Sequence, residues 1–151
     1  MADTISPENR SKNMASIRNK DTKPEIIIRK ALHKQGYRYR THAKHIPGSP
    51  DITLPKYSVA IFVHGCFWHK HDCHFFRIPK SNIDYWTLKL DRNASRDQEI
   101  LKQIRDKWRI GIVWECAIKG KTRRPLSDVT AQLSKWIHSE SAFMELTGAD
   151  V

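Results

Sequence analysis

The sequence predicts an α/β fold in which one mixed central sheet is flanked by helices. Two short runs, residues 59–63 and 109–114, are rich in β-branched and aromatic residues, which is typical of buried strands. Apolar residues at helical spacing lie between these runs and after the second one. Because predicted strands and helices alternate along the chain, we expect one sheet with helices on both sides.

The first half of the chain contains signals for one helix and three strands. The expected elements are a helix over about 24–35 and strands over 37–40, 51–54 and 59–64. Pro24 suits the first turn of the helix, Asp21 or Thr22 can cap it, and Gly36 lies past its end. A tight turn at 55–57 joins the last two strands, so we expect them to pair in antiparallel fashion.

The second half of the chain contains signals for three helices and one strand. A helix should start at Ser81 or Asn82 and end near residue 91, and a second should start at Asn93 or Ser95. The remaining elements are a strand over 109–114 and a last helix capped by Ser127, with apolar residues Val129, Leu133, Trp136 and Ile137 facing the sheet. Residues 141–151 are expected to form a C-terminal tail.

The composition points to a polyanionic partner. Among 151 residues, 27 Lys and Arg face 16 Asp and Glu, which gives a formal charge of +11 and a pI near 9.8. No run approaches membrane-spanning length, so no membrane partner is expected. Three cysteines and a polar N-terminus without a signal-peptide pattern favour a reducing cytosol, where metal binding is expected before disulfides.

This length predicts a single folded domain, over residues 21–140, preceded by a basic N-terminal arm over 1–20 that is partly ordered. Residues 10–20 of the arm are basic and polar, and Met14 and Ile17 lie three apart. This pattern fits an arm on a phosphate backbone. It fits equally well a solvated helix that packs through Met14 and Ile17.

A cysteine- and histidine-rich segment directly after the strand at 59–64 predicts a structural zinc site. Cys66, His71 and Cys73 supply three ligands from one loop. Cys116 supplies the fourth if strand 109–114 lies beside strand 59–64, because both cysteines follow the ends of buried strands. The competitors for this fourth position are His69 and His74. Four protein ligands leave no open position, so this zinc would hold structure and would not activate water.

Asp51, at the start of a predicted strand, is the candidate ligand for a catalytic Mg²⁺. Such a cation stabilises charge on a scissile phosphate and helps to activate a water molecule. The main-chain carbonyl of Val63, across the predicted hairpin, is the candidate second ligand. An Asp after Pro50 is more often a simple turn residue, so this assignment depends on the neighbouring zinc segment and on the basic charge.

Histidines near Asp51 are candidates for proton transfer. A neutral imidazole of His69 suits abstraction of a proton from water near pH 7. Glu25 could orient this imidazole, or it could simply complement the dipole of the first helix. His64 could donate a hydrogen bond to the phosphate or to its leaving oxygen.

Phe67, Trp68 and Trp86 are large flat side chains close to basic residues in the sequence. Such rings can wedge between base pairs, at a cost of a few kcal/mol for each unstacked step. This cost is lowest at a mismatch, so a wedge also detects damage. The alternative for Trp86 is ordinary packing on an amphipathic helix.

These residues together resemble the very short patch repair (Vsr) mismatch endonucleases of bacteria, from about residue 10 to residue 136. The motifs that carry the resemblance are Arg-Ser-Lys-Asn-Met at 10–14, Thr-Lys-Pro-Glu at 22–25, Pro-Gly-Ser-Pro-Asp at 47–51, His-Gly-Cys-Phe-Trp-His at 64–69, Asn-Ala-Ser-Arg-Asp at 93–97 and Val-Trp-Glu-Cys at 113–116. The resemblance implies a variant of the restriction-endonuclease fold with a structural zinc site.

The function implied by this family is a Mg²⁺-dependent endonuclease that nicks one strand of duplex DNA on the 5′ side of the thymine in a T:G mismatch. Such mismatches arise when 5-methylcytosine deaminates, and the nick starts repair. The resemblance also implies stimulation by the mismatch-repair protein MutL and a bacterial cytoplasmic location, on the nucleoid when bound to DNA. One nick needs one active site, so a monomer is expected.

The resemblance assigns roles position by position. It implies that Asp51 and the carbonyl of Val63 bind Mg²⁺, with His69, Glu25 and His64 as the catalytic groups. It implies zinc ligation by Cys66, His71, Cys73 and Cys116. It also implies DNA contacts by Phe67, Trp68 and Trp86 as the major-groove wedge, Met14 as the minor-groove counterpart, and Lys89 and Asn93 as base readers.

The chain departs from the family pattern at Val63, where Thr is expected. A carbonyl ligand survives that change, whereas a hydroxyl contribution does not. The second acidic residue and the Lys of the wider nuclease superfamily are also missing, so imidazoles would cover part of their work. Two other functions stay open: a zinc-stabilised module that binds mismatches without cutting, and a restriction enzyme that cuts both strands of paired DNA.

Overall fold

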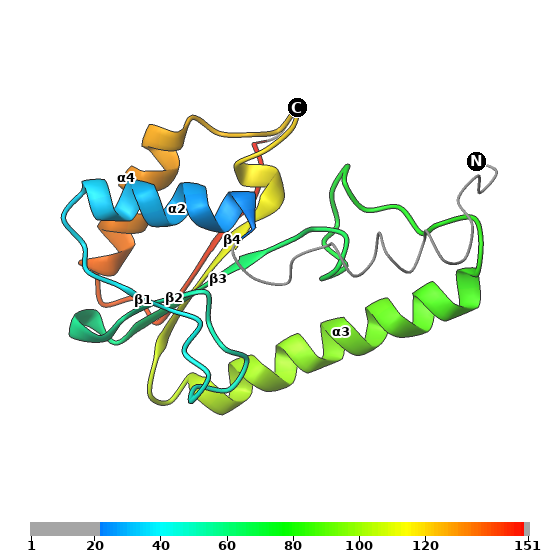
Figure 1. The fold of residues 1–151 in the computed structure, drawn as a ribbon, viewed down its shortest axis with the longest axis horizontal. Helices are drawn as coiled ribbons and strands as arrows, with labels where there is room; N and C mark the ends of the chain where they lie inside the picture. The colour runs from blue at the N-terminus through cyan, green and yellow to red at the C-terminus, as the bar shows by residue number, and fades with distance from the viewer. Residues whose placement is uncertain (1–21, 150–151) are drawn as a thin grey trace.

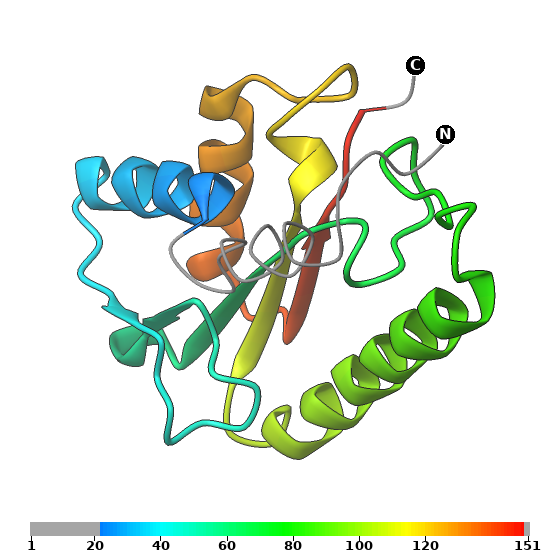
Figure 2. The ribbon, with the colours of Figure 1, turned by 45° about the vertical axis from the view of Figure 1, so that its right-hand side comes forward.

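The computed structural model describes residues 22–149, which form a five-stranded sheet with helices on both faces (Figures 1 and 2). Met14 and the expected N-terminal arm lie outside these residues. The elements are α2 (Lys23–Lys34), β1 (Arg40–Thr41), β2 (Ile52–Leu54), a 3₁₀ turn (Pro55–Tyr57), β3 (Val59–His64), α3 (Ile83–Ile104), β4 (Arg109–Trp114), a second 3₁₀ turn (Glu115–Ala117), α4 (Leu126–Ile137) and β5 (Phe143–Leu146).

The strands follow the order β1-β2-β3-β4-β5 across the sheet. β1, β2 and β3 are antiparallel, whereas β3, β4 and β5 are parallel, so the predicted mixed α/β sheet is confirmed. β3 is central and buried along its whole length. Its register places His64 opposite Trp114, so the segments that follow these two strands leave the sheet side by side.

Two apolar cores lie on the two faces of the sheet. α2 and α4 cover one face, where Ile28, Leu133 and Trp136 pack against β3 and β4 (Figure 1). Gly111 in β4 makes room for this packing, since an added Cβ would come within 2.8 Å of the Trp136 ring. The C-terminal part of α3 covers the other face, where Ile104 packs in the second core. The N-terminal part of the same helix extends beyond the sheet (Figure 2).

The prediction of two helices between residues 81 and 108 is wrong, because α3 runs unbroken over Ile83–Ile104. Asn93 was expected as an N-cap. Its side-chain amide instead donates to the carbonyl oxygen of Trp68, at 3.0 Å, and leaves the helix backbone intact. A tertiary hydrogen bond has therefore overridden a local capping signal.

Three smaller differences concern element ends. The strand expected over 37–40 is limited to β1, because Tyr37 turns into the core and its hydroxyl bonds Ser134 Oγ at 2.6 Å. The last helix begins after Pro125 without a side-chain cap, so Ser127 lies inside it. The tail expected over 141–151 contributes β5, an edge strand beside β4. Within residues 22–149, no helix has the length and apolar character needed to cross a membrane.

Candidate active site and metal cluster

A cleft of about 1030 Å³ lies where the ends of β2 and β3 meet the loop after β3 and the middle of α3. Most of the residues predicted for catalysis and DNA binding line this one cleft: Glu25, Asp51, Val63, His64, Phe67, Trp68, His69, Lys89 and Asn93. They come from α2, β3, α3 and two loops. The fold therefore gathers into one site groups that are far apart in the sequence.

Asp51 immediately precedes β2 and is fixed by the backbone of β3. Its Oδ2 accepts a 2.6 Å hydrogen bond from the N–H of Val63. β2 pairs with β3 only as far as Ile61, so the backbone of Val63 extends past the end of β2. Because the N–H and C=O of one strand residue point to the same side, the Val63 carbonyl is expected on the side of the Asp51 carboxylate. Two oxygen atoms of the kind that a hard cation binds would then lie at this edge.

The environment of Asp51 disfavours an isolated negative charge. Burial and the adjacent carboxyl group of Glu25 raise its pKa from 3.8 to about 8, although the Val63 N–H opposes this rise. Glu25, in the first turn of α2, is only 2% exposed and forms an ion pair of 2.8 Å with Arg29. Two buried carboxyl groups side by side are a site that a cation would stabilise.

The hydrogen-bond partner of His69 is Asp97, a residue that has no assigned role among the sequence-based predictions. His69 Nδ1 and Asp97 Oδ2 lie 2.6 Å apart, between the loop after β3 and α3. Glu25, expected to orient His69, instead shares a cluster with Asp51 and His42. A carboxylate at Nδ1 fixes the imidazole ring and leaves Nε2 free to accept a proton. The two residues are 28 positions apart, so no local pattern relates them.

His64 ends β3 and stacks flat on His69, with ring centroids 3.8 Å apart and planes 5° from parallel. Burial, and then the neighbouring His69 and His71, lower the pKa of His64 well below 6.5. His64 is therefore neutral at pH 7, with one N–H to donate. Its buried Nδ1 makes no hydrogen bond within residues 22–149.

Cys66, His71, Cys73 and Cys116 form a cluster whose ligand atoms all lie within 4.8 Å of one another. Cys116 Sγ and His71 Nδ1 are 3.6 Å apart. A tetrahedral zinc ion with Zn–S of about 2.3 Å and Zn–N of about 2.05 Å requires about 3.5 Å between such a pair. The donor set therefore fits a zinc ion. Cys116 joins the cluster because β3 and β4 are in register, and neither His69 nor His74 belongs to it.

The surroundings of this cluster hold its ligands in place. The His71 ring stacks on Trp114 at 4.1 Å, and the backbone N–H of Gly148 donates to Cys116 Sγ at 3.2 Å. Burial raises the pKa of the Cys66 and Cys116 thiols. Two buried thiols become thiolates only when a cation compensates the charge, which is the chemistry that a bound metal supplies.

The predicted aromatic wedge forms a contiguous cluster of three half-buried rings. The ring centroid of Phe67 lies 5.0 Å from that of Trp68 and 5.5 Å from that of Trp86. The centroids of the two tryptophan rings are 5.8 Å apart. Trp86 therefore packs with the loop aromatics and not with the main core. Phe67 and Trp68 also line the cleft, so this wedge borders the carboxylate and imidazole groups.

The two residues expected to read bases differ in their surroundings. Lys89 lines the cleft and is half-buried. Both polar atoms of the Asn93 side-chain amide are hydrogen-bonded. Nδ2 donates to the carbonyl oxygen of Trp68, and Oδ1 accepts from Arg96 at 2.6 Å. Asn93 thus ties the wedge loop to α3, and Arg96 also faces the cleft.

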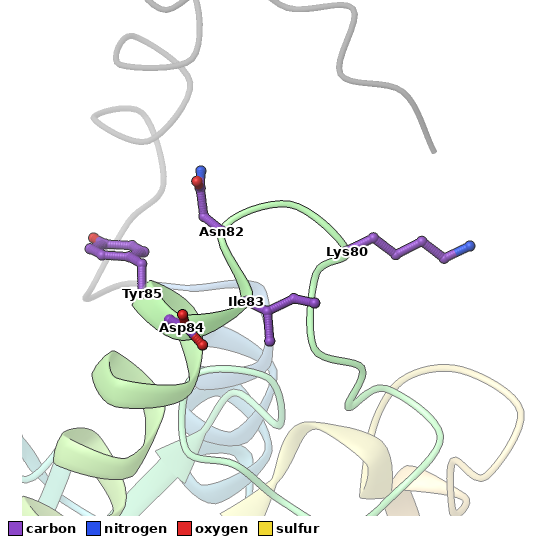
Figure 3. Close-up of a pocket in the computed structure, with 5 residues that line it drawn as sticks. All are labelled: Lys80, Asn82, Ile83, Asp84 and Tyr85. Atoms are coloured by element: carbon purple, nitrogen blue, oxygen red, sulfur yellow. The ribbon is translucent and has the colours of Figure 1, made fainter.

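A second hollow at the start of α3 has no comparable set of groups. Its side chains diverge, and Lys80 and Tyr85 point away from each other (Figure 3). Because no polar groups converge there, the hollow does not resemble a ligand site. Tyr85 is 57% exposed and lies 5.3 Å from Trp86, so it extends the aromatic surface.

One family model and several known proteins are similar to this chain. The family model described as DNA mismatch endonuclease Vsr matches residues 2–75. The DNA mismatch endonuclease Vsr of Escherichia coli is 36% identical over 147 residues, which cover 97% of this chain and 94% of that protein. The type II nicking enzyme V.XorIIP of Xanthomonas oryzae is 44% identical over 119 residues, 78% of this chain and 88% of that protein.

A third relative, the type II nicking enzyme V.NmeAIP of Neisseria meningitidis, is 44% identical over 125 residues, 80% of this chain and 87% of that protein. The class that these matches define is the DNA endonucleases. The chain belongs to the Vsr family of DNA mismatch endonucleases.

Proposed function

We propose that this protein is a Mg²⁺-dependent endonuclease that recognises T:G mismatches, nicks the DNA strand 5′ of the mismatched thymine and thereby starts very short patch repair. One observation carries the proposal: Asp51, the His69–Asp97 pair and two rings of the aromatic wedge, Phe67 and Trp68, all line one cleft. A distorted base pair held at the wedge would place its neighbouring phosphate at the carboxylates. Two of the relatives are named nicking enzymes, which agrees with cleavage of one strand.

Asp51 and the carbonyl of Val63 would hold the Mg²⁺ ion. Two points support this fit: the Val63 N–H bonds Asp51, and the carbonyl of the same strand residue is expected on the same side; and burial beside Glu25 makes the Asp51 charge unfavourable without a cation. When bound, Mg²⁺ neutralises charge on the phosphate and polarises a coordinated water. Val63 contributes only its backbone, so its apolar side chain is compatible with this role.

The imidazoles would move protons in the nicking reaction. His69, held at Nδ1 by Asp97, would use Nε2 to take a proton from the attacking water. Asp97 is a positioning residue that keeps the proton on Nδ1 and stabilises the imidazolium that forms. Neutral His64 would donate its N–H to a phosphate oxygen or to the leaving oxygen.

The wedge and the cleft would supply recognition. Phe67, Trp68 and Trp86 would enter the major groove at the mismatch, where unstacking is cheapest. Lys89 would contact bases directly. Asn93 would act partly through Trp68, whose carbonyl oxygen it binds. Met14 would be the minor-groove counterpart on the N-terminal arm, outside the described residues.

A zinc ion held by Cys66, His71, Cys73 and Cys116 would be structural, because four protein ligands leave no position for water. It would fix the loop that carries His69 and two rings of the wedge, Phe67 and Trp68. The net charge of +11 fits a double-stranded DNA partner and predicts steep loss of affinity with added salt. We further propose action as a monomer, with stimulation by MutL.

A duplex labelled separately on each strand, with and without a T:G mismatch, tests the proposal. We expect one nick, 5′ of the mismatched thymine, in the mismatched duplex alone and only with added Mg²⁺. Asp51→Ala should still bind this duplex but should not nick it. Nicking by Asp51→Ala at the wild-type rate would remove the mechanism. Mismatch binding without cleavage by the wild type would favour the binding module, and cuts in both strands of paired DNA would favour a restriction enzyme.

A further inference from the structure

His42, which follows β1, lies beside the two carboxyl groups of the candidate cation site. Ligand atoms of Glu25, His42 and Asp51 all lie within 4.8 Å of one another. These residues come from α2, the loop after β1 and the start of β2, and all three line the cleft. The cluster therefore combines two oxygen donors and one nitrogen donor at the place where Asp51 accepts from the Val63 N–H.

Arg29 orients this imidazole. Arg29 Nη2 lies 2.8 Å from Glu25 Oε2 and 3.1 Å from His42 Nε2. A guanidinium only donates hydrogen bonds, so His42 Nε2 must be the acceptor. In this contact the lone pair of His42 Nε2 therefore points to the side of the Arg29–Glu25 ion pair. A neutral imidazole is the form that ligates metals.

We propose that Glu25, His42 and Asp51 bind one divalent cation directly, and that the imidazole makes a first-row transition-metal ion such as Mn²⁺ a better occupant than Mg²⁺. This inference rests on the proposed function in one respect, because it takes Asp51 as the ligand of the catalytic cation. It adds two ligands from this chain, and it changes the chemical preference of the site.

The distances and the donor types support this assignment. Opposite ligands of a six-coordinate ion lie about 4.2–4.4 Å apart when each bond is about 2.1–2.2 Å. The ligand atoms of Glu25, His42 and Asp51 all lie within 4.8 Å of one another, which is near enough for small side-chain movements to close the site around one ion. Mg²⁺ prefers an all-oxygen shell and gives up water reluctantly, whereas an imidazole in the ligand set favours first-row transition metals. Arg29 can stay on Glu25 while His42 turns to the ion.

Pulsed electron paramagnetic resonance of Mn²⁺ bound to the zinc-loaded full-length protein tests the proposal without measuring activity. A directly bound imidazole gives ¹⁴N modulation, which changes when the histidines are labelled with ¹⁵N. We expect this signal in the wild type and its loss in His42→Gln. His45→Gln is the matched control, because His45 is an exposed histidine of the same loop that does not line the cleft.

Titration of the same proteins gives a second readout. We expect the Kd for Mn²⁺ to rise at least about tenfold in His42→Gln, with a smaller rise for Mg²⁺, because glutamine offers an oxygen in place of the nitrogen. Mn²⁺ that binds through Asp51 in the wild type, but without a nitrogen signal that depends on His42, would overturn this inference and leave the proposed function standing. Mn²⁺ affinity unchanged by Asp51→Ala would overturn both.

Discussion

Replacement of Asp51 by asparagine should stabilise the fold while it abolishes the proposed activity. In the folded protein, burial and the Glu25 carboxyl group raise the Asp51 pKa from 3.8 to about 8. The folded state therefore keeps a proton that the unfolded chain releases as the pH rises above 3.8, and stability falls over that range. An asparagine side chain at this position stays neutral at every pH, and its amide can accept from the Val63 N–H and donate to Glu25.

The magnitude follows from the two pKa values. Between pH 3.8 and pH 7 the unfolded chain loses the proton while the folded chain retains it, at about 1.4 kcal/mol for each pH unit. At pH 7 this amounts to about 4 kcal/mol of lost stability, and the loss levels off as the pH passes about 8. Asp51→Asn should recover most of it in buffer without Mg²⁺ or Mn²⁺.

Urea unfolding of the zinc-loaded protein between pH 5 and pH 7 measures this effect. The stability difference between Asp51→Asn and wild type should grow by about 1.4 kcal/mol per pH unit over this range. Asp106→Asn is the control, because Asp106 is exposed in the turn after α3 and should give no difference. A variant no more stable than wild type at pH 7, or a difference that does not change with pH, would refute the reasoning about a buried carboxyl pair.

Three further predictions concern the other parts of the site. Asp97→Asn should lower the nicking rate at least about a hundredfold and shift the pH profile of that rate, because His69 loses the group that fixes its tautomer. DNA affinity should not change. An unchanged pH profile would exclude this role for Asp97. Trp68→Ala should weaken binding to a T:G duplex by about 1–3 kcal/mol in a fluorescence titration, with little effect on paired DNA; equal losses on both duplexes would argue against a wedge. Cys116→Ala should remove bound zinc, which metal analysis would measure. It should also lower the Tm by at least about 10 °C, because loss of the metal costs several kcal/mol of folding stability and each kcal/mol corresponds to about 2–4 °C in Tm. An unchanged melt would show that the cluster is not structural.

The parts of the fold that follow from local patterns were predictable. The two central strands were predicted correctly because their apolar runs are buried on both faces, and the cluster with Cys116 followed from placing these strands side by side. β5 was missed because it is a short edge strand with only Leu146 buried. The break expected near Asn93 was wrong because the amide serves a distant carbonyl oxygen.

The missed parts of the site depend on contacts between distant residues. Asp97 lies in a polar stretch of α3 and ends the motif at 93–97, but neither its neighbours nor its spacing indicates which residue it contacts. Its role emerges only when α3 crosses the loop that carries His69. Arg29 and His42 likewise meet only because α2 lies next to the loop after β1. Spacing along the chain can predict ligands from one loop, but it cannot predict partners set by packing between elements.

A row of aromatic rings connects the Cys66–His71–Cys73–Cys116 cluster with the candidate catalytic groups. His71 stacks on Trp114 at 4.1 Å, Trp114 meets the edge of His64 at 5.1 Å, and His64 stacks on His69 at 3.8 Å. The first and last members of this row, His71 and His69, belong to the loop that also carries Phe67 and Trp68. A metal that fixes His71 therefore limits the positions open to His69. For this reason, zinc loss should impair mismatch binding and cleavage together, although no zinc ligand lies in the cleft.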